Sequence, residues 1–85
     1  MKIQLRFFAS MREKLGCSEE IVELPEQIKT VGEVRNYLIG RGGAWAEVLA
    51  EGRAVRMAYN LQMTGAETLI EDGAEVAFFP PVTGG

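Results

Sequence analysis

Apolar and polar residues alternate over residues 1–8, where Ile3, Leu5 and Phe7 fall on one face and the residues between them are polar. A period of two is typical of a β-strand with one buried face. The alternation breaks at Phe8, which predicts that the chain turns there. The chain is therefore expected to begin with a half-buried strand.

A short helix and a second strand are predicted next. Met11 and Leu15 are spaced i, i+4 and Gly16 follows them, which predicts a helix over residues 10–15 that ends at the glycine. Alternation returns over residues 19–24 and predicts a strand.

The best-marked helix of the chain begins after Thr30. Thr30 and Glu33 have the spacing of a capping box, in which each side chain accepts a hydrogen bond from the other residue's backbone. Behind this box the apolar residues recur at helical spacing, at Val31, Val34, Tyr37 and Leu38. A helix over residues 30–39 is expected, and burial of three of these side chains would stabilise the fold by roughly 1.5–3 kcal/mol each before entropy.

The second half of the chain predicts one more helix and three strands. The predicted segments are a helix over residues 44–50 and strands over residues 54–59, 68–70 and 74–79. Strands on both sides of one main helix indicate an α+β roll, a mixed sheet of about five strands with the helix packed across it. The first and last strands are the most apolar, so they are placed side by side in the middle. Because the last strand is apolar on both faces, it is either central or partly covered by another molecule.

Residues 80–85 differ from the domain of residues 1–79 that precedes them. Pro80 and Pro81 cannot continue a sheet ladder, so they direct the chain off the domain. Gly84 and Gly85 carry no side chain and add nothing to a core. Four residues follow Pro81, so an extended tail would reach about 14 Å beyond it. We expect a slim tail that presents a carboxylate, or else an ordinary frayed terminus.

Composition limits the classes of function. The chain has 85 residues, which is one domain, and a formal net charge of −3, which argues against nucleic-acid binding. No signal peptide is expected, since the strand pattern starts at once, and no apolar run is long enough for a membrane span. A cytoplasmic protein is the expectation.

Catalytic side chains are scarce. The chain has no histidine and a single cysteine, Cys17, so Cys/His zinc sites, four-cysteine iron–sulfur sites and serine–histidine or cysteine–histidine catalysis are excluded within it. Two acidic neighbours, Glu19 and Glu20, disfavour a reactive thiolate at Cys17. No metal site is predicted, and if the protein takes part in chemistry, most catalytic groups belong to a partner.

Several segments of the chain resemble one protein family, the small sulfur-carrying subunits of molybdopterin synthase. The segments are residues 5–9, Arg12-Glu13 with Gly16, Trp45-Ala46, Tyr59-Asn60, and above all residues 72–85 with their Phe-Phe-Pro-Pro-Val-Thr-Gly-Gly ending. The resemblance covers essentially the whole chain and implies a ubiquitin-like β-grasp fold, in agreement with the roll. Cys17 and the glycines of residues 40–43 depart from the family's pattern.

The resemblance also implies a mechanism. A ubiquitin-activating-type enzyme would use ATP and Mg²⁺ to adenylate the Gly85 carboxylate, and sulfur would then replace AMP to leave a thiocarboxylate, 1-thioglycine. The tail would enter the large catalytic subunit of a heterotetrameric molybdopterin synthase and give its sulfur to cyclic pyranopterin monophosphate. This chain itself would bind no cofactor and would not be an enzyme alone.

The same resemblance implies roles for individual residues. Gly85 would carry the reactive group, and Thr83 and Gly84 would thread into the partner. The partner-binding residues would be Phe79, Pro80, Pro81, Val82 and Arg12. From the sequence pattern alone, Phe79 is as well explained by the core as by an interface.

Three other functions remain open. Sulfur carriers for thiamin or tRNA thiolation also end in Gly-Gly on this fold, and so do modifiers that conjugate to lysines. An interaction module with an inert tail is the alternative outside these classes.

Overall fold

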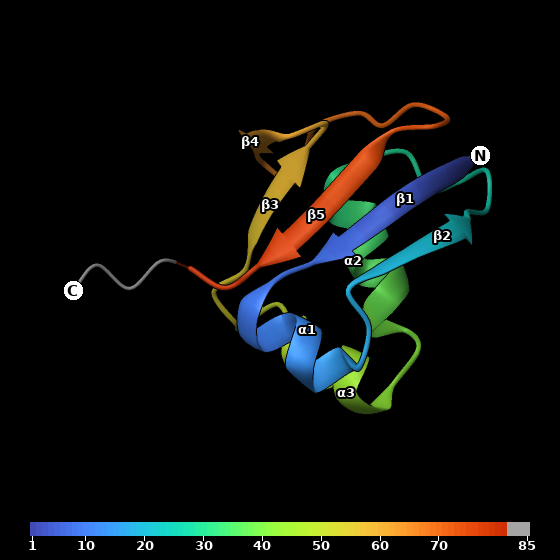
Figure 1. Ribbon diagram of the computed structural model, residues 1–85. Coiled ribbons are helices and arrows are strands. Elements are labelled where there is room, and N and C mark those ends of the chain that lie inside the picture. The colour runs from blue at the N-terminus through green and yellow to red at the C-terminus, as the bar shows by residue number, and fades with distance from the viewer. Residues whose placement is uncertain (82–85) are drawn as a thin grey trace.

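One mixed five-stranded sheet organises the computed structural model, which describes residues 1–81 (Figure 1). The strand order is β2-β1-β5-β3-β4. The elements are β1 (Lys2–Phe7), α1 (Ala9–Leu15), β2 (Glu19–Glu23), α2 (Val31–Ile39), α3 (Gly43–Val48), β3 (Arg56–Tyr59), β4 (Gln62–Thr64) and β5 (Glu75–Phe79). The predicted α+β roll of about five strands around one main helix is confirmed.

The first and last strands lie side by side in the middle of the sheet, as predicted. β1 and β5 are parallel, and Phe7 of β1 is the partner of Phe78 of β5. β2 pairs antiparallel with β1, and β3 pairs antiparallel with both β5 and β4. The parallel pair needs a crossover connection, and the chain from β2 through α2 and α3 to β3 supplies it.

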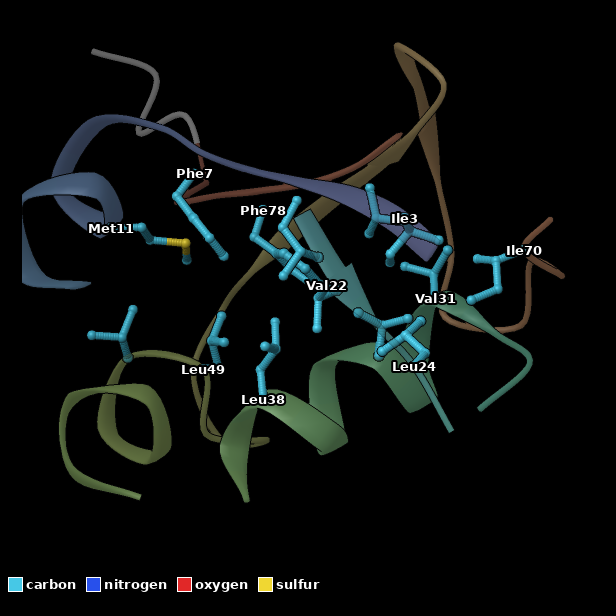
Figure 2. Packing of buried hydrophobic residues seen from close by; sticks show 14 residues of the cluster. Ile3, Phe7, Met11, Val22, Leu24, Val31, Leu38, Leu49, Ile70 and Phe78 are labelled. Carbon is cyan, nitrogen blue, oxygen red and sulfur yellow. The ribbon is translucent and has the colours of Figure 1, made fainter. Parts of the chain in front are cut away.

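Helix α2 covers one face of this sheet, and its first turn is fixed by the predicted capping box. The Glu33 N–H donates to Thr30 Oγ1 at 3.1 Å, and the Thr30 N–H donates to Glu33 Oε1 at 3.1 Å. Val31, Val34 and Leu38 are each 0% exposed and belong to the core cluster with the inward side chains of the strands. Figure 2 shows Val31 and Leu38 in this cluster. The apolar spacing of the sequence therefore predicted which face of α2 is buried.

The predicted strand over residues 68–70 is wrong. Leu69 makes only an isolated bridge to Thr30, and the fourth strand is β4 (Gln62–Thr64), earlier in the chain. A tight turn at Asn60 and Leu61, with φ of 47° and 71°, joins β3 to β4. Two successive residues with positive φ are typical of a two-residue β-hairpin turn, but Leu61 is not a residue that normally signals one.

Two predicted elements are shorter than expected. β3 begins at Arg56 rather than at residue 54, because only residues 56–59 pair with β5. α3 ends at Val48, where Leu49 takes a non-helical conformation at the C-cap. The chain between these elements instead forms a loop that Arg35 of α2 holds by hydrogen bonds.

Helix α1 and Trp45 of α3 close the end of the core nearest the C-terminal end of β1. Gly16 ends α1 with φ of 77°, as predicted from its place in the sequence. The Trp45 ring meets Phe7 edge to face at 5.3 Å between centroids, and the Arg41 guanidinium lies 4.6 Å from the Trp45 ring centroid. Trp45 therefore packs against the core and covers this end of it.

Candidate functional site at the tail base

The C-terminal tail leaves the domain at the end of the central strand β5. β5 ends at Phe79, and Pro80 and Pro81 follow it outside the sheet. Because β5 runs parallel to β1, the tail leaves at the end of the sheet opposite the N-terminus (Figure 1). The predicted site residues Val82, Thr83, Gly84 and Gly85 lie outside the described residues.

An apolar groove of about 620 Å³ lies beside this exit. Its lining residues on β5 alternate with the core residues Val76 and Phe78, so it lies on the face of the sheet opposite to the one that α2 covers (Figure 1). Its lining residues are Phe8, Ala9, Ala58, Leu61, Met63, Glu75, Ala77, Phe79, Pro80 and Pro81. The small side chains of the paired residues Ala58 and Ala77 form its floor, and the longer side chains stand around them. Leu61 is 84% exposed and Met63 is 55% exposed, which is unusual for large apolar side chains gathered in one place.

Leu61 holds an unfavourable backbone conformation at the rim of this groove. Its φ of 71° lies in the left-handed region, which costs a residue with a Cβ about 1 kcal/mol or more. The turn is nevertheless fixed, since the Glu75 N–H donates to Asn60 Oδ1 at 2.9 Å and the Asn60 N–H donates to the Glu75 carbonyl at 2.9 Å. A strained, exposed leucine contributes nothing to the core, so its position indicates a binding surface.

Phe79 lies in the groove and not in the core. Its ring meets Phe8 edge to face at 6.2 Å between centroids, and Phe8 is itself 39% exposed. The preceding residue, Phe78, points the other way and is 0% exposed. The alternation of β5 thus gives one phenylalanine to the core and one to the open face.

A charged rim borders the groove on the side of β1. The Arg6 guanidinium lies 5.4 Å from the Phe8 ring centroid, and it pairs with Glu75 at 3.6 Å and with Glu19 at 3.8 Å. Arg6 and its two glutamates therefore make the part of this sheet face over β1 and β2 polar, and Arg6 contacts the Phe8 ring from that side. The apolar half, over β5, β3 and β4, is left open.

Arg12 is not brought to the groove. It is exposed on α1, but it does not line the apolar groove or the second hollow beside Pro80 and Pro81. Its predicted contact with a partner stays a prediction. The structure brings together Phe79, Pro80 and Pro81 among the predicted partner-binding residues that it describes.

Cys17 lies away from the tail base, in the turn after α1. Burial raises the pKa of its thiol, the nearby Glu20 carboxylate raises it further, and Arg41 opposes both effects. A raised pKa disfavours the reactive thiolate. The neighbouring Glu20 has a lowered pKa because Arg41 donates hydrogen bonds to it at 2.9 and 2.6 Å.

The described part of the chain holds neither a cluster of metal ligands nor a helix that could span a membrane. Residues 1–81 contain no group of three or more His, Cys, Asp or Glu side chains arranged to hold a metal ion. None of the helices among the same residues has the length and apolar character to cross a bilayer.

The sequence did not predict Phe8, Leu61 and Met63 as site residues. Two sequence signals bear on this face of the sheet. Phe8 breaks the alternation of the first strand, and the last strand is apolar on both faces, which predicted that it is either central or partly covered by another molecule. Only the pairing of β3 with β4 shows that Met63 shares a face with Ala58.

Comparisons with known proteins agree with this arrangement. The sequence profile of the ThiS family matches residues 5–85. The chain belongs to the ThiS family. The resemblance stated from the sequence is confirmed by a curated relative, the molybdopterin synthase sulfur carrier subunit of Haemophilus influenzae, which is 36% identical over 98% of this chain and 99% of its own length.

Other relatives of this ThiS-family chain differ in name. The small archaeal modifier protein 3 of Haloferax volcanii is 34% identical over the full length of both chains. Among solved structures, SAMP1 from Haloferax volcanii superposes with a TM-score of 0.79 over 100% of both chains, at 24% identity. At that identity the superposition supports the fold alone, and it confirms the ubiquitin-like β-grasp architecture.

Proposed function

We propose that this chain is the sulfur carrier of a molybdopterin synthase, with the C-terminal carboxylate of Gly85 as the group that carries sulfur. The observation that carries the proposal is the 36% identity to a curated sulfur carrier subunit over nearly the whole of both chains. The family match also extends through Gly85. The apolar groove beside the tail base supports the proposal, because a carrier needs a surface on which its partners hold it.

The proposed loading of sulfur has two steps. A Gly85 carboxylate oxygen attacks the α-phosphate of ATP, the bond between the α- and β-phosphates breaks, and pyrophosphate leaves. A carboxylate is a poor acyl donor because its oxygen is a poor leaving group, whereas the acyl adenylate has AMP as a good leaving group. Hydrosulfide, from the sulfur donor, then attacks the Gly85 carbonyl carbon, AMP leaves, and loss of a proton gives the thiocarboxylate. An adenylating enzyme of the ubiquitin-activating type supplies the site for ATP and Mg²⁺, where metal and cationic groups hold the phosphates.

In the proposed transfer, the thiocarboxylate sulfur attacks a side-chain carbon of the pterin substrate that carries an oxygen substituent, in the large catalytic subunit. The carbon–sulfur bond forms as that carbon–oxygen bond breaks, and the oxygen leaves on the phosphate or as water. Hydrolysis of the resulting acyl–sulfur bond leaves the sulfur on cyclic pyranopterin monophosphate and returns Gly85 as a carboxylate. Gly85 enters the partner first, and Gly84 and Thr83 follow it into the channel. Glycine suits this task because a backbone without Cβ atoms can pass a narrow channel.

The apolar groove is the proposed docking surface for the large subunit. Phe79 and Leu61 offer the exposed apolar area, and Pro80 and Pro81 give the chain a stiff exit from that surface. Continuity between groove and tail means that docking of the sheet face aims the tail at the partner. Aromatic side chains in such a position commonly dominate binding energy.

Replacement of Phe79 by alanine is expected to weaken binding of the large subunit by about tenfold to a hundredfold, since a central aromatic contact contributes roughly 1–3 kcal/mol or more. The melting temperature should fall only slightly, because Phe79 packs mainly on exposed Phe8. Titration calorimetry and thermal unfolding measure the two effects. The matched change Phe78→Ala should instead destabilise the domain by about 3–5 kcal/mol. A large loss of stability in Phe79→Ala with unchanged binding would assign Phe79 to the core.

The function is tested by reconstitution. The thiocarboxylated carrier, the large subunit and cyclic pyranopterin monophosphate should together form molybdopterin, and the unmodified carrier should not. Sulfur transfer to a thiamin precursor or to tRNA, with no product from the pterin, would identify another client of the same chemistry.

Protein modification is a second candidate function, favoured by the 34% identity to a small archaeal modifier protein. In that case Gly85 would form isopeptide bonds with lysines of other proteins. Larger conjugates of the tagged chain in cell extracts, absent when Gly85 is deleted, would support this second function.

A further inference from the structure

A second hollow lies on the other side of the tail base, between α1 and the loop that precedes β3. It has a volume of about 280 Å³. Its lining residues are Ser10, Met11, Lys14, Val48, Arg53, Ala54, Pro80 and Pro81. Because Pro80 and Pro81 line both this hollow and the apolar groove, the tail leaves the domain between two different surfaces.

The charge of the second hollow is opposite to that of the whole chain. Lys14 and Arg53 line it, and none of its lining residues is acidic, although the chain carries a formal net charge of −3. Both side chains belong to exposed residues, and neither is in an ion pair with another of the residues 1–81. The hollow with Lys14 and Arg53 is called the basic hollow below.

The loop that presents Arg53 is held in place by Arg35 of α2. The Arg35 guanidinium donates to the carbonyls of Leu49, Ala50 and Arg53 at 2.7, 2.6 and 3.1 Å. The Arg53 N–H in turn donates to the Ala50 carbonyl at 2.8 Å. A planar guanidinium that bonds three carbonyls fixes the backbone of this loop. Arg53 is therefore held beside the tail and not carried on a loosely attached loop.

We propose that the basic hollow is a second docking surface, which binds aspartate or glutamate side chains of the protein that receives the tail. The inference rests on the proposed function, in which the large catalytic subunit takes up that tail. The apolar groove supplies affinity on one side of the tail, and the basic hollow attracts and orients an acidic partner surface on the other. Charges at the edge of an interface act mainly on association and orientation.

Distance favours protein carboxylates over nucleotide phosphates as the ligand. Gly85 is four residues beyond Pro81, so an extended tail places its reactive carboxylate about 14 Å past the hollow. A nucleotide bonded to Gly85 would then lie outside the reach of Lys14 and Arg53. The partner surface around the channel entrance is the part that faces the basic hollow.

Charge reversal tests the inference. The double variant K14E/R53E should bind the cognate large subunit about tenfold more weakly than the unchanged chain at low ionic strength. The loss should shrink at high salt, where exposed charges are screened. The neutral variant K14Q/R53Q should lie between them. Titration calorimetry of the full chain at two salt concentrations gives these values, and thermal unfolding checks that the exposed substitutions leave the fold intact.

The matched control is K2E/K29E, which lowers the net charge by the same amount at the other end of the domain. Lys2 begins β1, and the Lys29 carbonyl accepts from Ile70, ahead of β5. This control should change binding less than twofold. Equal effects of the two double variants on binding would overturn the inference. It would also be overturned if K14E/R53E bound the large subunit normally but had a raised KM for ATP in adenylation, since that result would assign the hollow to the nucleotide. If the unchanged chain fails to bind the large subunit at all, the proposed function fails with it.

Discussion

Deletion of Gly85 is expected to abolish sulfur transfer while the domain stays folded. Removal of one residue shortens an extended tail by about 3.5 Å, and a displacement of even 1 Å at a reacting centre can reduce the rate about a hundredfold. The buried core cluster contains no residue after Phe78 among those that the structure describes, so stability should not change. Molybdopterin formation in the reconstituted synthase measures the first effect, and thermal unfolding measures the second.

Gly84→Val tests the threading role without changing the length of the tail. A branched side chain should block passage into a narrow channel and reduce transfer as strongly as the deletion. Gly52→Val is the matched control, because a Cβ at Gly52 meets nothing within 4 Å and its backbone lies outside the left-handed region. Molybdopterin formation at the normal rate by either tail variant would show that Gly84 and Gly85 do not carry the reaction.

Val34→Asp is expected to unfold the domain. Val34 is 0% exposed on the buried face of α2, so the change removes apolar burial and places a carboxylate without a partner in the core. The cost of such a change reaches about 4–5 kcal/mol, which is comparable with the whole stability of a small domain. Circular dichroism and chemical unfolding at neutral pH should show loss of the cooperative transition.

Asn36→Asp is the control for this substitution, because it introduces the same residue at an exposed position of the same helix. Its effect should stay within about 0.5 kcal/mol. A Val34→Asp variant with an unchanged unfolding midpoint would contradict the packing of α2 on the sheet, and with it the fold that places the tail.

The sequence predicted the elements whose signals are local. The capping box at Thr30 and Glu33 placed the start of α2, and its apolar spacing placed the buried face. The predicted strand over residues 68–70 was wrong because a short apolar run does not show whether the segment has a strand to pair with. The turn at Leu61 holds a leucine in a conformation that favours glycine, so no sequence signal marked the β3–β4 hairpin.

Site residues that follow one another in the sequence could be predicted, but those brought together by strand pairing could not. Phe79, Pro80 and Pro81 follow one another at the end of the last strand, and their place at the tail base could be expected from order alone. The groove depends on Met63 and Leu61, which reach it only because β4 pairs with β3. The hydrogen bonds by which Arg35 holds the loop before β3 go to three backbone carbonyls. Because every residue has a backbone carbonyl, the sequence carries no signal for these bonds.

The central claim is that Gly85 carries the reactive sulfur, and intact-mass spectrometry tests it most directly. The chain is incubated with its cognate adenylating enzyme, ATP, Mg²⁺ and a sulfide donor, and the mass is compared with a sample that lacks ATP. We expect an ATP-dependent gain equal to the exchange of one oxygen for one sulfur, located at Gly85 by fragmentation. A chain that keeps its original mass, while the same enzyme forms the Gly85 adenylate and releases AMP from it, would contradict the account.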